Sequence, residues 1–309
     1  MTAPIAYLVL AHANPEHLGR LLGAVASENA TVFVHVDAKS DLAAFASLRG
    51  PRVRFIEPRK RVYWGDFSQV EAILALLRAA TSASPSFSRF VLLSGADYPL
   101  RSTAYIEQFF ARQPKAEFMN LVSIPCDEAG KPLSRVTSFQ RRKGAPFSYL
   151  ERSLRRAAVR FGISKVERDH RHALRDTPPF GGSTWWALTR PACEHLLDFV
   201  ARHPPVVRFF KNAIYPDELM FHTIIGNSVF RPFVLRNVTY TDWRKGGSNP
   251  AQIDEDHLTM FESTHEVIAH DAYGNGEMLF ARKLGPASAA LVDRLDAMRA
   301  RKGVGSSPP

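Results

Sequence analysis

"IAYLVLAHANPEHLGRLLGAVA", residues 5–26, opens the chain with the pattern that decides its fold class. Residues 5–11 form a short apolar run that is typical of a buried strand. The stretch that follows places Leu18, Leu21 and Val25 on one face of a helix. A strand that leads directly into an amphipathic helix is the repeating unit of a parallel sheet with helices on its faces. The sequence therefore predicts an α/β protein.

Similar strand and helix patterns continue along the rest of the chain. Strands are predicted at residues 30–37, 53–57, 90–97 and 234–243, and helices at 66–80, about 148–160, 191–203 and about 286–301. Ser68 and Glu71 offer a capping box inside the start of one helix. Because we find no internal repeat and no separable linker, we expect one continuous domain over residues 1–302. A disordered tail is expected at 303–309.

Composition limits the class of protein. The chain has 309 residues, of which 45% are hydrophobic and 23% charged, as in an ordinary soluble globular protein. Cys126 and Cys193 lie far apart without a CxxC or Cys/His cluster, which argues against a disulfide framework or a structural zinc site. The first apolar run is too short to span a membrane and lacks the basic region of a signal peptide. We therefore predict a cytoplasmic protein.

The formal net charge of +10 is concentrated in the middle of the chain. Residues 141–176 carry eleven Lys and Arg side chains against four acidic ones. A solvated helical face with loops is the simpler interpretation. The alternative is peripheral contact with an anionic membrane, at its inner face, or with an acidic substrate. No zinc finger, RNP motif or helix-turn-helix pattern supports nucleic acid as a partner.

Polar clusters follow three of the predicted strands, where ligands bind in sheets of this kind. Asp37 and Lys39 follow one strand and could bind a base or a sugar by hydrogen bonds. Trp64 offers a flat face for a ring, and Asp97 ends a third strand. Each of these residues taken alone is more often structural. Together they predict a binding site at one edge of the sheet.

Basic residues in the last third could hold a phosphate. Arg244 and Lys245 lie beside two glycines, and Lys283 follows at some distance. Arginine suits phosphate through its planar fork, and lysine through its compact charge. There is no P-loop, no GxGxxG after a strand and no GxSxG, which leaves P-loop hydrolysis, dinucleotide redox chemistry and serine hydrolysis unsupported.

The stretch "AIYPDELMFHT", residues 213–223, puts an acidic pair in front of an apolar run. Pro216 suits the first position of a helix, and Asp217 and Glu218 suit its first turn, where they face the positive end of the helix dipole. A catalytic base is the alternative. Glu218 and His222 are four residues apart and could share a metal ion, although a surface pair or a core histidine is the simpler interpretation.

Seven motifs in order carry a resemblance: "HVDAKS", "YWGDFSQVEA", "LLSGADYPL", "GGSTWWALTR", "YPDELMFHTIIGNS", "TYTDWRK" and "LFARK". With them the chain resembles the glycosyltransferase family of core-2/I-branching N-acetylglucosaminyltransferases and peptide O-xylosyltransferases. The resemblance covers most of the chain, from the first strand to Lys283.

The resemblance implies a GT-A type fold. A Rossmann-like nucleotide half, about residues 1–120, would be joined to an acceptor and catalytic half, about residues 121–302. Enzymes of this family transfer a sugar from a UDP-sugar to a hydroxyl with inversion and without a divalent metal. We therefore expect a UDP-sugar donor, with xylose or N-acetylglucosamine as the sugar, a glycan or peptide acceptor, and no metal cofactor. The one acidic string, residues 254–256, reads as the first turn of a helix.

The resemblance also implies roles for single residues. The catalytic base would be Glu218. The expected donor-binding residues are Asp37, Lys39, Trp64, Asp97, Arg244, Lys245 and Lys283, of which the last three would face the diphosphate. The expected acceptor-binding residues are Gly181, Gly182, Ser183 and Trp185. Thr184 stands where xylosyltransferases tend to have an acid, so the acceptor stays open.

Two other functions remain as alternatives. A glycoside hydrolase needs two carboxylates that face each other across a sugar. Asp217 and Glu218 are adjacent in the predicted helix and make a poor pair, because neighbouring helical residues point in different directions. A non-catalytic protein that binds a glycan or an anionic surface through residues 141–176 is the second alternative.

Overall fold

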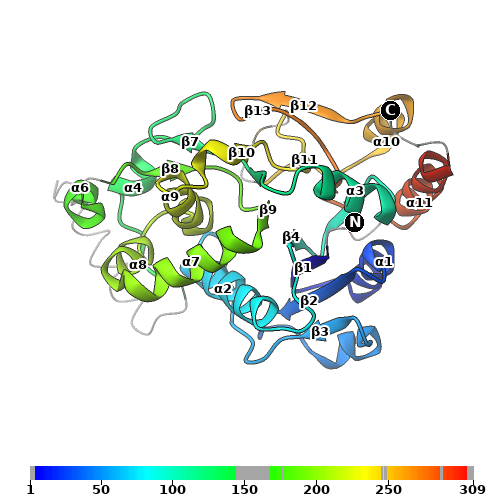
Figure 1. The fold of residues 1–309 in the computed structure, drawn as a ribbon, viewed down its shortest axis with the longest axis horizontal. Coiled ribbons are helices and arrows are strands. Elements are labelled where there is room, and N and C mark those ends of the chain that lie inside the picture. Colours follow the sequence, from blue (N-terminus) through cyan, green and yellow to red (C-terminus); the bar gives the residue numbers. More distant parts are fainter. Residues whose placement is uncertain are drawn as a thin grey trace, which may run out of the picture.

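The computed structural model describes residues 4–143, 168–175, 177–244, 246, 249–285 and 288–304, with side chains to residue 302. A seven-stranded sheet lies at the centre of the molecule (Figure 1). Its order from edge to edge is β10 (Val234–Leu235), β6 (Glu117–Met119), β9 (Trp186–Thr189), β4 (Arg89–Ser94), β1 (Ile5–Ala11), β2 (Ala30–Val36) and β3 (Val53–Phe55).

The sheet is mostly parallel. β1 lies between β2 and β4 and is parallel to both, with Leu8 opposite Phe33 on one side and Leu92 on the other. β9 is the exception, because it runs antiparallel to both β4 and β6. The predicted α/β class is therefore confirmed. β9 and β10 come from the second half of the chain, so the predicted halves share one sheet and build a single domain.

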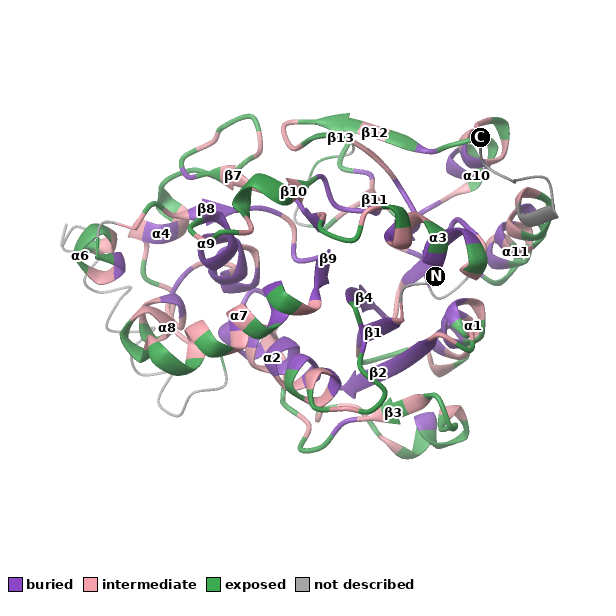
Figure 2. Ribbon diagram, in the orientation of Figure 1, coloured by how far each residue is buried: buried purple, intermediate pink, exposed green. Residues whose placement is uncertain are grey.

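Alternation along β1 produces a core on each face of the sheet. Tyr7 and Val9 pack in a cluster with α1 (Pro15–Val25), whereas Leu8 packs in a second cluster with α2 (Phe67–Thr81). Successive side chains of a strand point to opposite faces, so an uninterrupted apolar run is what a strand covered on both faces requires. Figure 2 shows the central strands as buried.

Helices cover both faces of the sheet (Figure 1). The α-helices after α2 are α3 (Thr103–Arg112), α4 (Ser134–Thr137), α6 (His170–Leu174), α7 (Arg190–Arg202), α8 (Pro204–Phe210), α9 (Met220–Gly226), α10 (Glu255–Ser263) and α11 (Ala289–Val304). Short 3-10 helices are η1 (Ala43–Leu48), η2 (Pro216–Glu218) and η3 (Arg231–Phe233). The predicted helix at about 148–160 lies outside the described residues.

A second sheet has three strands, β11 (Thr239–Thr241), β14 (Phe280–Arg282) and β5 (Asp97–Pro99). The predicted strand 90–97 is therefore wrong as one element, because the Ser94 N–H donates to Asp97 Oδ2 at 2.8 Å and turns the chain into the second sheet. The predicted strand 234–243 likewise divides into β10 and β11. Between them, the Asn237 N–H donates to Asn120 Oδ1 at 3.0 Å and leaves the first sheet.

Two further antiparallel pairs complete the strands of the described residues. They are β12 (Ile268–Asp271) with β13 (Gly274–Glu277), and β7 (Val122–Ser123) with β8 (Phe180–Gly181). The capping box predicted at the start of α2 is wrong. Asp66 is the N-cap and accepts from the Ser68 N–H at 2.8 Å, while the Glu71 carboxylate pairs with Arg142 at 2.7 Å. Asp66, one position before the helix, satisfies the free N–H of Ser68. The Ser68 hydroxyl does not cap the helix but accepts from the Tyr63 N–H at 2.9 Å.

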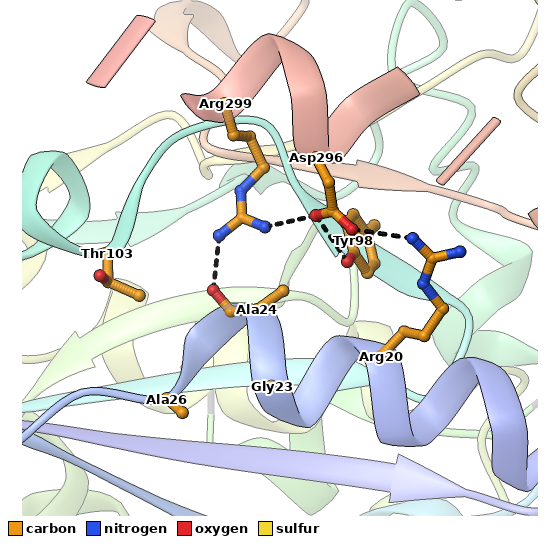
Figure 3. A pocket seen from close by; sticks show the side chains of 8 residues that line it. All are labelled: Arg20, Gly23, Ala24, Ala26, Tyr98, Thr103, Asp296 and Arg299. Carbon is orange, nitrogen blue, oxygen red and sulfur yellow. Dashed lines mark hydrogen bonds and ion pairs between the residues drawn. The ribbon is translucent and has the colours of Figure 1, made fainter. Parts of the chain in front are cut away.

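Helix α11 is attached to α1 through Asp296. Its carboxylate accepts from Arg20 at 2.8 Å, from the Tyr98 hydroxyl at 2.9 Å and from Arg299 at 2.9 Å (Figure 3). A cavity of about 440 Å³ lies here, between α1 and α11. Its charged lining groups pair with one another, and it contains none of the predicted site residues. We interpret it as part of the contact between the helices.

The remaining predictions concern the ends of the chain and its location. Helix α11 extends to Val304, two residues into the predicted tail, and residues 305–309 lie outside the described part. Both Cys126 and Cys193 are free thiols. Within the described residues, none of the helices combines the length and the apolar character that crossing a membrane requires. Most of the basic segment 141–176 lies outside the described residues, so membrane contact and the cytoplasmic location stay predictions.

Candidate active site

Asp37 and Lys39 lie together where the central strands end. The Asp37 N–H donates to the Ala11 carbonyl at 2.8 Å, so the ends of β1 and β2 are adjacent. The buried Asp37 carboxylate accepts from the Lys39 N–H at 2.9 Å and from the Val62 N–H at 3.3 Å. Lys39 Nζ lies 3.4 Å from the same carboxylate. Asp37 therefore organises the loops around it, and a direct contact with uridine stays a prediction.

Trp64 lies farther along the loop that contains Val62. Its indole is 51% exposed and meets the Tyr215 ring edge-on, with 5.0 Å between ring centroids. Gly65 has φ +68°, and a Cβ there would lie 2.9 Å from the Tyr215 ring, so glycine is required for this contact. Asp37 and Lys39 form what we call the strand-end cluster. Because Tyr215 starts the turn that contains Glu218, Trp64 connects this cluster with the predicted base.

Asp97 is completely buried. Its carboxylate accepts from Ser94 and forms an ion pair with Arg282 at 2.7 Å, across the register of β5 and β14. The Arg282 guanidinium lies 4.2 Å from the centre of the Trp185 ring. A direct contact between Asp97 and the donor stays a prediction. In this structure the carboxylate positions Arg282, a residue that the sequence analysis missed because its partner is 185 positions away.

Arg244 and Lys283 follow two neighbouring strands. β11 and β14 are parallel, with Thr241 opposite Arg282, so the residues after them lie at the same edge. Arg244 forms a forked pair with Asp242, through Nε at 3.0 Å and Nη2 at 3.1 Å. The bonds from Arg244 are the main reason that the pKa of Asp242 lies well below its usual range. Lys245 lies outside the described residues.

His12 is a further residue at this edge that the sequence analysis missed. It directly follows β1, and desolvation and the neighbouring Lys283 ammonium lower the pKa of its imidazole. The charges of Asp37, Lys39 and Arg282 also act on it. His12 therefore joins the strand-end cluster to the cations after β14. Its place immediately after the first strand was the signal available in the sequence.

Glu218 lies in the 3-10 helix η2 and not in the first turn of an α-helix. Tyr215 has a left-handed backbone, with φ 54°, and its carbonyl accepts from the Glu218 N–H at 3.0 Å. The α-helix α9 begins only at Met220. The predicted helix start at Pro216 is therefore wrong for α9, because the left-handed residue and the i to i+3 bonds close a separate turn first.

Two cations hold the Glu218 carboxylate. Oε2 lies 2.5 Å from Lys131 Nζ and 3.5 Å from Arg135 Nη1, and the side chain is 24% exposed. The Arg135 guanidinium also lies 4.5 Å from the centre of the Tyr215 ring. Neither cation was predicted from the sequence, since neither belongs to a motif and Lys131 is 87 positions from Glu218. The ion pair fixes the position of the carboxylate, which stays partly open to solvent.

Asp217 points into the protein interior. Its Oδ2 accepts from the Thr184 hydroxyl at 2.6 Å and from Gln69 Nε2 at 3.0 Å, while its buried Oδ1 has no hydrogen-bond partner among the described residues. Burial, followed by the nearby Glu218 charge, raises the pKa of Asp217 to about 6. The two adjacent carboxylates therefore have different partners, and they do not face each other as a hydrolase pair would.

The glycine pair supports the backbone of Glu218. The Gly182 N–H donates to the Glu218 carbonyl at 3.0 Å, and a Cβ on Gly182 would lie 1.7 Å from the Asn120 carbonyl oxygen. The Ser183 carbonyl accepts from His222 Nε2 at 2.9 Å. Gly181, Gly182 and Trp185 are buried, so their expected contact with an acceptor stays a prediction.

His222 and Glu218 do not approach each other as metal ligands would. His222 is buried against Ser183, and burial lowers the pKa of its imidazole to about 3. Glu218 is paired with Lys131. Within the described part of the chain, His, Cys, Asp and Glu side chains form no group of three that could hold a metal ion. The acidic string at 254–256 caps and begins helix α10, as predicted.

Similar proteins were found by sequence and by structure. The chain is 26% identical to human xylosyltransferase 2 over 254 residues, which are 78% of this chain and 27% of that protein. It is 24% identical to dog xylosyltransferase 1 over 253 residues, again 78% of this chain and 24% of the relative. The chain thus spans about a quarter of the length of the curated relatives that it matches.

A similar solved structure is the apo form of mouse xyloside xylosyltransferase 1. The aligned region covers 90% of this chain and 97% of the mouse chain, with 14% identity and a TM-score of 0.35. The family model of the Core-2/I-Branching enzyme matches residues 5–266, and this range contains the sheet, the Glu218 turn and Arg244. The chain belongs to the Core-2/I-Branching enzyme family of glycosyltransferases.

Proposed function

We propose that this protein transfers a sugar from a UDP-sugar to a hydroxyl group of a glycan or peptide acceptor, with inversion and without a metal ion. Xylose and N-acetylglucosamine are the sugars that the family relationship favours. The observation that supports this proposal best concerns the acidic pair. Glu218 is partly exposed and lies beside two cations, whereas Asp217 is buried with a raised pKa.

Glu218 would act as the general base. In a single displacement the attacking hydroxyl must lose its proton as the new bond to the anomeric carbon forms, and a carboxylate within hydrogen-bond reach can accept it. Lys131 and Arg135 hold the carboxylate in one place until the acceptor arrives. An incoming hydroxyl would bind beside Lys131, where part of the Glu218 side chain is open to solvent.

Arg244 and Lys283 would neutralise the departing diphosphate. Fixed positive charge at the point where negative charge develops lowers the barrier, as a metal ion does in other enzymes. These two residues follow adjacent parallel strands, and Lys245 follows Arg244 directly in the sequence. Asp37 and Lys39 would bind the uridine at the neighbouring strand end, with Trp64 at the side that leads toward Glu218.

One short segment joins the proposed donor and acceptor sides. Trp185 packs under Arg282, and the preceding residue Thr184 holds Asp217. Ser183 precedes them and is held by His222. A sugar bound between Arg282 and Glu218 would therefore contact this segment, in accord with the proposed acceptor role of Ser183 and Trp185.

Isothermal titration with UDP, followed by assays of UDP-xylose and UDP-N-acetylglucosamine turnover, tests the proposal. We expect UDP to bind with equal affinity in the presence and absence of excess EDTA, and one of the two donors to be hydrolysed slowly without acceptor. Failure of UDP to bind under either condition would overturn the proposed function. A strict requirement for manganese would overturn the metal-independent mechanism alone.

A further inference from the structure

Arg244 is an exposed cation whose guanidinium is bound by the buried carboxylate of Asp242. The side chain of Arg244 is 76% exposed, whereas that of Asp242 is 2% exposed. Their contact uses Nε and Nη2 of the guanidinium, one to each carboxylate oxygen, so Nη1 stays outside the fork. Because a forked pair fixes the plane of the guanidinium, the orientation of Asp242 decides where the free edge of Arg244 points.

His257 determines the orientation of Asp242 from the opposite side. Its Nε2 lies 3.1 Å from Asp242 Oδ2. Its Nδ1 faces Asp254, whose N–H lies at 3.2 Å and whose Oδ1 lies at 2.5 Å. Nδ1 can therefore accept from the N–H or donate to the carboxylate. In both cases Nε2 carries the proton, because a bare nitrogen would face the negative charge of Asp242.

Aromatic packing holds the His257 ring in place. The residue is 3% exposed, and its ring lies 5.9 Å from that of Tyr240 on β11 and 6.4 Å from that of Phe261 on α10. The Tyr240 and Phe261 rings are themselves in edge-to-face contact at 5.2 Å. The imidazole is thus a rigid link between the start of helix α10 and the end of strand β11.

The segment before His257 also supports the second cation. The Ala251 N–H donates to the Asp242 carbonyl at 2.8 Å, and the Ile253 N–H donates to the Lys283 carbonyl at 2.9 Å. Residues 251–257 therefore contact the backbone beside Arg244 and that of Lys283. The segment spans the two strand ends whose cations we assign to the diphosphate.

We propose that His257 is a positioning residue for donor binding, which acts through Asp242 on Arg244 and does not touch the donor. This inference rests on the proposed function, in which Arg244 binds the diphosphate of a UDP-sugar. Loss of the Nε2–H bond would remove the support of Oδ2, while Oδ1 keeps its bond from the Arg244 N–H at 2.8 Å, and the direction of the guanidinium would be less firmly fixed. Donor affinity would then fall while the Glu218 chemistry remained intact.

Two substitutions separate the roles of the two ring nitrogens. In His257→Asn the side-chain amide stays near the position of Nδ1 and keeps the cap of α10, but the donor to Asp242 is lost. In His257→Gln the amide nitrogen reaches the position of Nε2 and restores that donor. Asp254→Asn is the control, because it keeps an N-cap side chain and leaves the contact between His257 and Asp242 unchanged.

The experiment measures the UDP dissociation constant, and the donor KM and kcat, for each variant. We expect His257→Asn to weaken UDP binding and raise the donor KM about five- to tenfold, in the range of the net contribution of one ordinary hydrogen bond, and kcat should fall as well because Arg244 also stabilises the departing diphosphate. His257→Gln should recover most of the affinity, and Asp254→Asn should match the wild type. Unchanged UDP affinity in His257→Asn would overturn the inference.

A double substitution tests the route through Arg244. In the Arg244→Ala background, His257→Asn should cause no further loss of UDP affinity, because coupled residues are not additive. Additive losses would overturn the inference. If His257→Asn does not fold, Asp242→Asn in the same cycle breaks the link from its other end, with the same expectation. Wild-type protein that fails to bind UDP would overturn the proposed function, whereas binding that depends on Arg244 but not on His257 overturns only this inference.

Discussion

The Glu218 carboxylate lies 2.5 Å from the ammonium of Lys131, a residue 87 positions earlier in the chain. The contact joins the η2 turn to the loop that begins at Cys126, where Cys126 and Lys131 exchange backbone hydrogen bonds at 2.8 Å. One carboxylate of an adjacent acidic pair is thereby placed at the surface beside fixed positive charge. This arrangement makes Glu218, and not Asp217, the candidate base.

Replacement of Glu218 by glutamine keeps the shape of the side chain and removes its capacity to accept a proton. We expect Glu218→Gln to lower kcat by about 100-fold or more, in the range found for loss of a general base, with UDP affinity unchanged. Steady-state kinetics and UDP titration measure the two effects. Glu255→Gln, on the exposed start of α10, is the control. Normal turnover in Glu218→Gln would exclude the residue as the base.

Arg244→Ala and Lys283→Ala should each weaken UDP binding about tenfold, since a charge-assisted contact with phosphate is lost. The loss should be smaller at high salt, where exposed charges are screened. Titration with UDP at two ionic strengths measures both effects. Arg112→Ala, an exposed arginine in α3, serves as the matched control and should bind UDP as the wild type does. Equal losses in all three variants would contradict a specific phosphate site.

Asp217 should make stability depend on pH. Its pKa is about 6 in the folded protein against a usual value of 3.8. Between pH 3.8 and pH 6, therefore, the folded state holds a proton that the unfolded state has lost. The free energy of unfolding should therefore fall as pH rises from about 4 to about 6, by up to about 3 kcal/mol, and remain level above that range.

Asp217→Asn should remove this slope. The amide keeps an acceptor for Thr184 and Gln69 and does not titrate, and burial of its NH₂ group adds a cost that is the same at every pH. Urea unfolding of both proteins between pH 4 and pH 7 gives the comparison. If the difference in the free energy of unfolding between wild type and Asp217→Asn stays constant from pH 4 to pH 7, Asp217 is ionised in the folded protein over that range.

Gly182→Ala should destabilise the protein by about 3 kcal/mol or more, because the new Cβ would lie 1.7 Å from the Asn120 carbonyl oxygen. Gly23→Ala is the matched control. Its Cβ meets no atom within 4 Å in helix α1, and alanine there should raise stability by about 0.5–1 kcal/mol. Thermal unfolding of both variants measures the difference. A stable Gly182→Ala would mean that the Asn120 backbone moves away at low cost.

Local patterns were reliable wherever neighbouring residues decide the structure. The run 5–11 is strand β1 within the predicted bounds, and the acidic string at 254–256 does begin a helix. Errors occurred where a side-chain hydrogen bond or a left-handed residue ends an element. Three such features each divide a stretch whose apolar pattern is continuous. They are the hydrogen bond from the Ser94 N–H to Asp97, the hydrogen bond from the Asn237 N–H to Asn120, and the left-handed backbone of Tyr215.

The sequence by itself determined the α/β class, the acidic pair at 217–218 and the family motifs, because apolar periodicity and ordered motifs are properties of neighbouring residues. Only the tertiary structure decided which acid is buried and which is paired. It also brought Lys131 to Glu218, Arg282 to Asp97 and His257 to Asp242. The physical reason is that ionisation and hydrogen bonding depend on distances between side chains, and folding sets those distances independently of separation along the chain.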